Sequence, residues 1–448
     1  MNSHHFNQEP FLEVGIVSGL QLHVTFPTPY CLQQAGKTQE NSDLYFEGDH
    51  IITYEDGSIL FQGNTYDRLH FVPTRADGRF ELHDVRIGIG FHWERTERQA
   101  FEGEITFIVS NNAVTAINRV LLESYLTSVI SSEMSANASK ELLKAHAVIS
   151  RSWLLAQVLK KGKKGQAENG MKETPTERAK WYDREDHDLF DVCADDHCQR
   201  YQGVTKASNP NVKRAIHHTR GQVLSSGGQL CDARFSKSCG GYLEEFQYCW
   251  ENAPKPYLVG KPDRDVKKNE TAPPLPDLRH EQEAKAWILG NPDSFCNTHD
   301  PAILSQVLNS YDQETPDFYR WKVNYTRQEI STLFAQRSGI DVGDILEIEP
   351  LERGVSGRIV RLRVVGSKQT YIIGKELEIR RSFSNTHLYS SAFVVKKTET
   401  GFILHGAGWG HGVGLCQIGA AVMGEQGYSY KDILAHYYPS TTLDTLYP

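Results

Sequence analysis

Two stretches of the chain carry clear helical patterns, Arg119–Met134 (RVLLESYLTSVISSEM) and Ser139–Lys161 (SKELLKAHAVISRSWLLAQVLKK). In the first stretch, apolar residues recur mostly every three or four positions, at Leu122, Leu126, Val129, Ile130 and Met134. This spacing predicts an amphipathic helix. In the second, Ser139 is a typical helix-capping residue, and Glu141 falls in the first turn near the positive end of the helix dipole. The sequence therefore predicts two consecutive helices.

Strand-like segments lie on both sides of these helices. Before them, short apolar runs bounded by Gly, Asp and Asn predict strands between Leu12 and Phe91, and a hairpin around Ser110–Asn112. After them, strand-like runs return between Ile345 and Val395. Further helices are expected at Glu281–Leu289, Pro301–Asn309, Arg327–Arg337, Gly419–Glu425 and Tyr430–Tyr437. Such runs favour an α+β fold, a β-rich body with a two-helix segment and additional small helical insertions.

Polar stretches divide the chain into four expected parts. Residues 160–184 are rich in Lys, Glu and Gly and are expected to form an exposed loop, and a second polar stretch spans 263–276. The expected parts are a β-rich N-terminal region at 1–103, a two-helix segment at 104–262 with a candidate metal loop at 187–203, a helical insertion at 263–344, and a β-rich part at 345–448.

The composition indicates a folded protein and argues against a dedicated nucleic-acid binder. The 448 residues carry 48 Lys and Arg against 56 Asp and Glu, a formal net charge of −8, whereas nucleic-acid binders usually present a basic face. The 7 Trp, 20 Tyr and 19 Phe residues argue against disorder. No apolar run reaches the roughly 18 residues of a transmembrane segment. Met1–Pro10 has neither the basic nor the apolar region of a signal peptide.

Glu133 is the first candidate for chemistry. It lies three residues after Ile130 and seven after Leu126, so it falls on the apolar face of its predicted helix. Partial burial there would raise the pKa of its carboxyl and suit a general acid; the alternative is a helix-end Glu that points to water. Arg151 interrupts an apolar stripe of the second helix, either to meet an anion such as Glu133 or to extend into solvent.

His187, Cys193, His197 and Cys198 form the second candidate. Two thiolates and two imidazoles are the ligands that tetrahedral zinc prefers, although their spacing is not that of a familiar zinc finger. A closed set of four ligands favours a structural ion. The alternative is a pair of free thiols beside surface histidines in an acidic loop. Eight cysteines in the chain are too few for a disulfide scaffold.

Two glycine-containing segments form the third candidate. Gly406–Gly414 (GAGWGHGVG) has glycine at every second position, so a ligand or another backbone can approach one face closely. It matches no nucleotide-binding fingerprint. Ser236–Gly241 (SKSCGG) is a turn-like segment whose Cys239 is either a nucleophile or, more commonly, a buried inert thiol. No serine-hydrolase elbow or zinc-protease motif is present.

Four segments together resemble the SpoIID/LytB family, whose sporulation member is a peptidoglycan lytic transglycosylase. They follow the family's order and span about Thr106 to Pro448: Leu121–Met134 (LLESYL…SSEM), Leu143–Ser152 (LKAHAVISRS), Ser238–Gly241 (SCGG) with Trp250 and Pro256–Leu258, and Gly410–Gly419 (GHGVGLCQIG) with His436–Pro439 (HYYP). Two positions depart from the family pattern. His146 stands where Gln is usual, and Cys416 where Ser is usual.

The resemblance implies that Glu133 is the catalytic acid and that Arg151 belongs to the same site. In the family's reaction one carboxyl protonates the glycosidic oxygen between MurNAc and GlcNAc, and then acts as base while the sugar's 6-hydroxyl attacks the anomeric carbon. The product is a 1,6-anhydro end, and no second carboxylate is needed, unlike in the two-carboxylate glycosidases. Substrate contacts are expected from Lys144, Ser238, Cys239, Gly240, Tyr242, His411, Gln417 and Tyr437.

The resemblance also implies a structural zinc ion at His187, Cys193, His197 and Cys198, and no nucleotide or organic cofactor. The implied substrate is peptidoglycan glycan already stripped of stem peptides, which implies a location in the cell envelope or outside the cell. A second reading is a non-catalytic glycan-binding protein that stimulates a cell-wall amidase, as the LytB branch is described. A third is a hydrolase that uses Cys239 or the His187 cluster.

Overall fold

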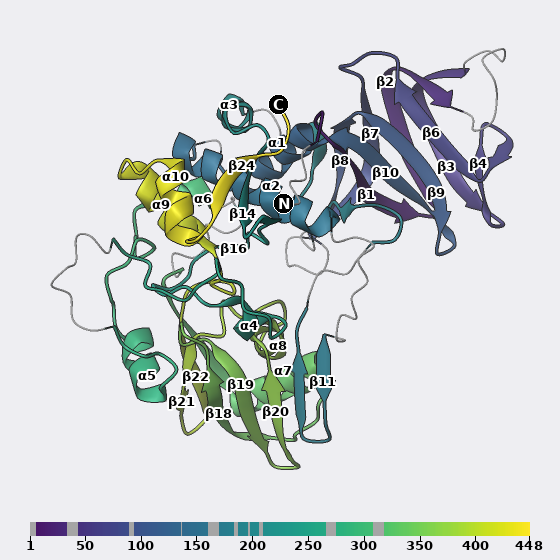
Figure 1. The fold of residues 1–448 in the computed structure, drawn as a ribbon. Helices are drawn as coiled ribbons and strands as arrows, with labels where there is room; N and C mark the ends of the chain where they lie inside the picture. The colour runs from purple at the N-terminus through teal and green to yellow at the C-terminus, as the bar shows by residue number, and fades with distance from the viewer. Residues whose placement is uncertain are drawn as a thin grey trace. The chain divides into compact units, whose positions relative to one another are not determined.

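The chain forms two compact units, each assembled from separated stretches (Figure 1). The computed structural model describes residues 6–33, 44–88, 94–135, 137–159, 170–182, 187–195, 198–205, 209–265, 275–307 and 318–448. We call residues 2–136, 184–222 and 445–448 the sheet unit, and residues 137–183 and 223–444 the mixed unit. The four-part division of the sequence stays a prediction.

The sheet unit is built on one large sheet. Its strands are β1 (Phe11–Gly19), β2 (Gln21–Gln33), β3 (Leu44–Glu55), β4 (Ser58–Phe61), β5 (Asn64–Tyr66), β6 (Arg68–Pro73), β7 (Arg79–Ile87), β8 (Arg95–Glu102), β9 (Glu104–Ser110), β10 (Ala113–Leu121) and β13 (Val192–Cys193). Their order is β13-β1-β10-β9-β6-β2-β3-β4-β5, and β7 pairs with both β2 and β8. The predicted hairpin is confirmed as β9–β10, and its turn residues Asn111 and Asn112 adopt φ values of 50° and 57°, which asparagine tolerates better than most residues.

Aromatic side chains fill the core of the sheet unit. Alternate residues of its strands point inward, and the rings of Phe26, Phe71 and Phe80 are fully buried. The unit also contains α1 (Leu122–Glu133), the 3₁₀ turn η1 (Gly203–Thr205) and α3 (Pro210–His218). The chain returns to this unit at its C-terminal end, where the Tyr447 hydroxyl donates to the Glu123 carboxylate 324 residues earlier.

The mixed unit holds several small sheets. Its strands are β11 (Met171–Glu173), β12 (Glu177–Lys180), β14 (Gln222–Ser226), β15 (Gln229–Leu230), β16 (Phe235–Ser236), β17 (Arg320–Thr326), β18 (Ile345–Arg353), β19 (Ile359–Gly366), β20 (Thr370–Gly374), β21 (Phe393–Lys397), β22 (Gly401–Ala407), β23 (Leu415–Cys416) and β24 (Thr442–Thr445). The sheet orders are β11-β12-β20-β19-β18, β17-β22-β21, β15-β14-β24 and the pair β16-β23.

Helices pack against these sheets. They are α2 (Lys140–Val158), α4 (Phe246–Cys249), α5 (Glu281–Leu289), α6 (Pro301–Val307), α7 (Arg327–Ser338), α8 (Glu376–Ser382), α9 (Gln417–Glu425) and α10 (Tyr430–Tyr437). The Ser139 side chain caps α2 by accepting from the Leu142 N–H, as the sequence predicts. Residues from α7, α8 and β17–β22 form a shared apolar core that includes Trp321, Phe334 and Phe383. Figure 1 shows α7 and α8 beside β18–β20.

The α+β class is confirmed: the structure contains both helices and sheets, and most neighbouring strands are antiparallel. The prediction of a loop over residues 160–184 is wrong for residues 171–180, which form the β11–β12 hairpin, although residues 171–176 are exposed as predicted. Residues 160–169 and 183–184 lie outside the described residues. This hairpin forms because β12 pairs in parallel with β20 and because Arg178 bonds Glu378 at 2.6 Å. Within the described residues, the helices are too short or too polar to cross a membrane.

Candidate active site and metal centre

Glu133 is the last residue of α1, and its side chain is half-buried. On the same face Leu126, Val129 and Ile130 are fully buried, so the predicted helical face is confirmed. Glu133 is thus a partly exposed residue at the end of a helix whose neighbouring turns are buried. A group in that position can be reached by a ligand while part of its surroundings excludes water.

Arg151 lies in the middle of α2 and is fully buried. One of its guanidinium nitrogens donates to the Ala147 carbonyl at 3.4 Å. The alternative in which Arg151 extends into solvent is therefore wrong. Glu133 belongs to the sheet unit and Arg151 to the mixed unit, so their convergence on one substrate stays a prediction.

The two glycine-containing segments of the mixed unit lie side by side. Ser238 and Trp409 exchange two backbone hydrogen bonds of 3.0 and 2.8 Å, and β16 runs parallel to β23 next to them. A Cβ atom added to Gly240 would lie 2.7 Å from the Gly408 nitrogen, and both glycines have φ near +75°. The glycines are therefore needed for contact between two backbones.

The residues predicted to bind substrate divide into two groups by exposure. Lys144, Tyr242 and His411 keep partly exposed side chains. Ser238, Cys239, Gly240, Gln417 and Tyr437 are buried. Of the two groups, only the first offers side chains that an external ligand can contact without rearrangement of the protein. Substrate binding by either group stays a prediction.

Each of these three partly exposed residues has a defined neighbour, which for Tyr242 is the ring of Trp287. Lys144 forms an ion pair of 2.6 Å with Glu141. His411 accepts the Val413 N–H on Nδ1 at 3.0 Å, and its ring lies edge-on to Trp250. Burial and neighbouring guanidinium groups hold the pKa of His411 well below its usual range. The imidazole is therefore neutral, with Nε2 left to carry its proton.

Cys239 does not have the surroundings of a nucleophile. Its side chain is 2% exposed, and burial raises the pKa of its thiol well above the ordinary value. A reactive cysteine needs an accessible thiolate. The position of Cys239 therefore argues against the thiol-hydrolase reading. It instead contacts Asp263 and Cys296, two residues that the sequence patterns did not single out because they lie far from it in the chain.

The candidate metal loop brings its described members together. His187 Nε2 lies 3.5 Å from Cys198 Sγ, and the Cys193 N–H donates to Cys198 Sγ at 3.5 Å. The donor atoms of these three residues all lie within 4.8 Å of one another. Two sulfurs and an imidazole are a zinc-type donor set, and β13 fixes Cys193 by pairing with β1. His197 lies outside the described residues.

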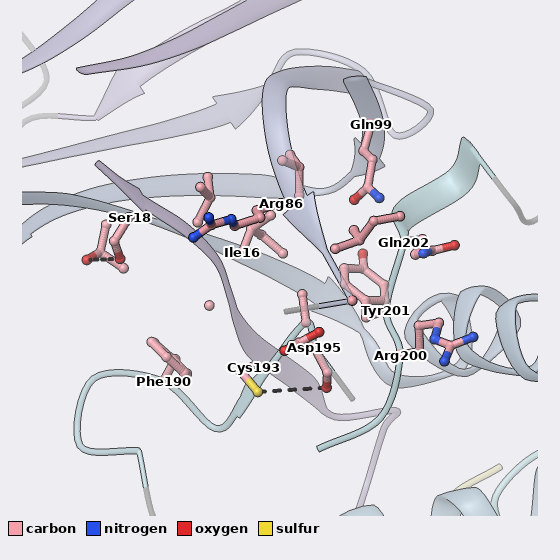
Figure 2. Close-up of a pocket in the computed structure, with 17 residues that line it drawn as sticks. Ile16, Ser18, Arg86, Gln99, Phe190, Cys193, Asp195, Arg200, Tyr201 and Gln202 are labelled. Carbon is pink, nitrogen blue, oxygen red and sulfur yellow. Dashed lines mark hydrogen bonds between the residues drawn. The ribbon is translucent and has the colours of Figure 1, made fainter. Parts of the chain in front are cut away.

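A cavity of about 300 Å³ adjoins this loop in the sheet unit (Figure 2). Figure 2 shows Cys193, Asp195, Gln99, Tyr201 and Gln202 among the residues that line it, with Asp195 beside Tyr201. The lining combines polar side chains such as Arg86, Gln99 and Gln202 with apolar ones such as Val85 and Phe190, and such a mixture suits a ligand with several hydrogen-bonding groups. The sequence did not indicate this cavity because its lining comes from stretches far apart in the chain, at residues 15–18, 85–88, 99, 115 and 190–202.

Comparison with known proteins identifies two matching regions. Residues 110–225 match the family model described as "Stage II sporulation protein", and residues 244–414 match a domain of unknown function, DUF8618. The first match contains α1, α2 and the candidate metal loop. It therefore covers Glu133, Arg151 and the predicted zinc ligands.

Three curated relatives carry informative names. The "Amidase enhancer" of Bacillus subtilis (strain 168) is 30% identical over 246 residues, which is 52% of this chain and 33% of that protein. The chain thus spans about a third of the length of this relative. "Stage II sporulation protein D" of Bacillus amyloliquefaciens is 22% identical over 81% of this chain and 84% of its own length. Its counterpart in Bacillus subtilis (strain 168) is 22% identical over 76% and 79%.

Proposed function

Because this chain belongs to the SpoIID/LytB family through residues 110–225, we propose that it is a lytic transglycosylase that cleaves the MurNAc–GlcNAc linkages of peptidoglycan glycan strands. The substrate expected for this activity is glycan already stripped of its stem peptides. Such a substrate lies beyond the cytoplasmic membrane, so the proposal includes a location in the cell envelope or outside the cell.

The position of Glu133 supports this proposal. Glu123 lies on the same helix but is 7% exposed and accepts hydrogen bonds from the Gly221 N–H and the Tyr447 hydroxyl. The Glu123 carboxylate is therefore buried and occupied by hydrogen bonds within the protein. Glu133, at the other end of α1, is half-buried and accessible. Of the two acidic residues of α1, only Glu133 can meet a sugar.

In the proposed reaction Glu133 acts twice. As an acid it gives its proton to the glycosidic oxygen while the bond from that oxygen to the anomeric carbon breaks. As a base it then takes the proton of the MurNAc 6-hydroxyl while that oxygen bonds to the anomeric carbon. The carboxyl returns to its starting state, no water is consumed, and the product carries a 1,6-anhydro ring. Arg151, buried in α2, is assigned a positioning role.

Zinc has a structural place in this proposal. His187, Cys193 and Cys198 would hold the ion, with His197 as the fourth ligand predicted from sequence. A bound zinc ion would crosslink the loop that follows β13 and so fix one wall of the adjoining cavity. No step of the glycan reaction depends on it.

Mass spectrometry of the products tests the proposal. Purified glycan strands, intact and amidase-stripped, are incubated with the wild-type protein, with Glu133→Gln and with the control Glu102→Gln, a partly exposed carboxylate of the same unit. We expect anhydro-muramyl ends with wild type and control, and turnover at least ~100-fold lower with Glu133→Gln, as for loss of a general acid. Reducing ends would refute the transglycosylase mechanism and point to attack by water.

The second candidate function is enhancement of a cell-wall amidase. The 30% identical relative that bears this name favours it. The test adds the chain to a purified amidase acting on intact peptidoglycan. Stimulation that persists in Glu133→Gln, together with glycan binding and no cleavage, would favour the enhancer over the enzyme.

A further inference from the structure

Three cysteines and an aspartate meet in the interior of the mixed unit. Cys239, Cys296, Cys416 and Asp263 are at most 2% exposed, and one donor atom from each lies within 4.8 Å of all the others. Cys239 lies in the SCGG turn and Cys416 in β23, whereas Asp263 and Cys296 lie in two separate loops. Side chains in such number and so close together form a cluster, which we call the thiol cluster.

The distances within the thiol cluster match those of a tetrahedral metal site. Cys239 Sγ lies 3.5 Å from Cys296 Sγ and 3.3 Å from Asp263 Oδ2. A zinc–sulfur bond of about 2.3 Å implies sulfur–sulfur edges of about 3.8 Å in a tetrahedron. Shifts of a few tenths of an ångström would therefore admit an ion at the centre. Thiolate and carboxylate are both zinc ligands, and thiolate selects thiophilic metals over magnesium or calcium.

The carboxylate of Asp263 is oriented toward the sulfurs by neighbours on its other side. Its Oδ1 accepts from His436 Nε2 at 3.1 Å and from the Tyr437 hydroxyl at 2.9 Å. This leaves Oδ2 facing Cys239. Hydrogen bonds from a surrounding layer of residues that aim a ligand in this way are typical of protein metal sites. The Cys239 N–H in turn donates to Cys416 Sγ at 3.3 Å, a contact that stabilises a thiolate.

Positive charges border the thiol cluster. Arg358, 1% exposed, donates to the Cys239 carbonyl at 3.2 Å, and Arg320 donates to the Gly240 carbonyl at 3.0 Å. Lys261 donates to the His436 carbonyl at 2.6 Å. Three thiolates and a carboxylate around a divalent ion leave a net negative charge, and buried charge requires compensation. The three cations supply it.

We propose that Cys239, Cys296, Cys416 and Asp263 bind one divalent thiophilic metal ion, with zinc as the best match. On binding, the three thiols release their protons and the ion gains three metal–sulfur bonds and one metal–oxygen bond. All four positions are protein ligands, so the site is structural. The ion links Cys239 to Cys296 and Cys416, which lie 57 and 177 positions later in the chain. It thereby fixes the SCGG turn against β23, between the two segments predicted to contact substrate.

Metal analysis of the purified full chain tests this site separately from the His187 group. Zinc content is measured by native mass spectrometry and elemental analysis in wild type, in Cys193→Ser/Cys198→Ser, and in that double variant with Cys416→Ser added. We expect the double variant to retain one equivalent and the triple variant to lose it. Cys231→Ser, a buried thiol of the same unit outside the cluster, is the matched control and should keep its metal.

Co²⁺ spectra, and a check for disulfides in the non-reduced protein, test the proposal even if the triple variant does not fold. With Cys193→Ser/Cys198→Ser, Co²⁺ should give sulfur-to-metal charge transfer and the intense visible bands of tetrahedral coordination. Chelation should lower the melting temperature by roughly 5 °C or more. Absence of both metal and cobalt bands would overturn the proposal. So would a Cys239–Cys296 disulfide in the non-reduced protein, because it would remove two of the four ligands.

Discussion

His146 makes the mixed unit sensitive to acid. The ring is fully buried, with Nδ1 3.1 Å from the Ser150 hydroxyl and Nε2 3.3 Å from the Gln417 amide nitrogen. Burial, reinforced by the charge of Lys237, lowers the pKa of His146 from 6.5 to about 3. The folded protein therefore holds this histidine neutral, whereas the unfolded chain protonates it near pH 6.5.

The sign and size of the effect follow from this difference. A depressed pKa in the folded state contributes stability that is fully present above pH 6.5 and is lost as the pH falls toward about 3. Each pH unit in that window costs about 1.4 kcal/mol. Lowering the pH from 6.5 to 4.5 should therefore remove about 2.5 kcal/mol of unfolding free energy through this one residue.

His146→Gln isolates this contribution, because an amide can keep both polar contacts but cannot be protonated in this range. Urea unfolding followed by circular dichroism at pH 7.5, 5.5 and 4.5 measures the difference in unfolding free energy between variant and wild type. We expect that difference to move in favour of the variant by about 2.5 kcal/mol across the series. His299→Gln, exposed in the same unit, is the control. A difference that stays constant with pH would refute the reasoning.

Three further substitutions test the packing around the candidate sites. Arg358→Lys should cost about 2–4 kcal/mol, because a lysine cannot replace the buried guanidinium contacts; an unchanged urea midpoint would contradict this. Tyr201→Phe removes a buried 2.7 Å hydrogen bond to Asn118 and should cost about 1–2 kcal/mol in the same assay, with no change in the overall circular dichroism spectrum. Gly240→Ala should lower soluble yield or cost about 2 kcal/mol or more, since its φ is +75° and its Cβ would lie 2.7 Å from the Gly408 nitrogen; wild-type stability would show that this approach is not needed.

Local signals predicted local structure well. The cap at Ser139 depends on a side chain and a backbone group three residues apart, so the start of α2 could be read directly from the sequence. The turn at Asn111–Asn112 is equally local, because asparagine itself favours the required backbone angles. In the candidate metal loop, His187, Cys193 and Cys198 span only 12 residues, and they do converge.

Features that depend on distant partners could not be predicted. The strands at Met171–Glu173 and Glu177–Lys180 are polar, and they form because β20, about 200 residues later, offers an edge to pair with. The thiol cluster depends even more on residues that are far apart in the chain. Nothing near Cys239 indicates that Cys296 and Asp263 will reach it, because only the folded chain brings these segments together. The exposure of Glu133 could be predicted only in part, since spacing gives the helical face but not the depth of burial.

The contact between Tyr447 and Glu123 sets an order of events during synthesis. The two residues lie 324 positions apart, and a ribosome working at roughly 10 residues per second needs about half a minute to cover that interval. Helix α1 leaves the ribosome early, but the residues that close over its first turn follow only after the entire second stretch of the mixed unit, residues 223–444. The sheet unit is therefore begun first, and its contact with the C-terminal residues can form only after residues 223–444 have been made.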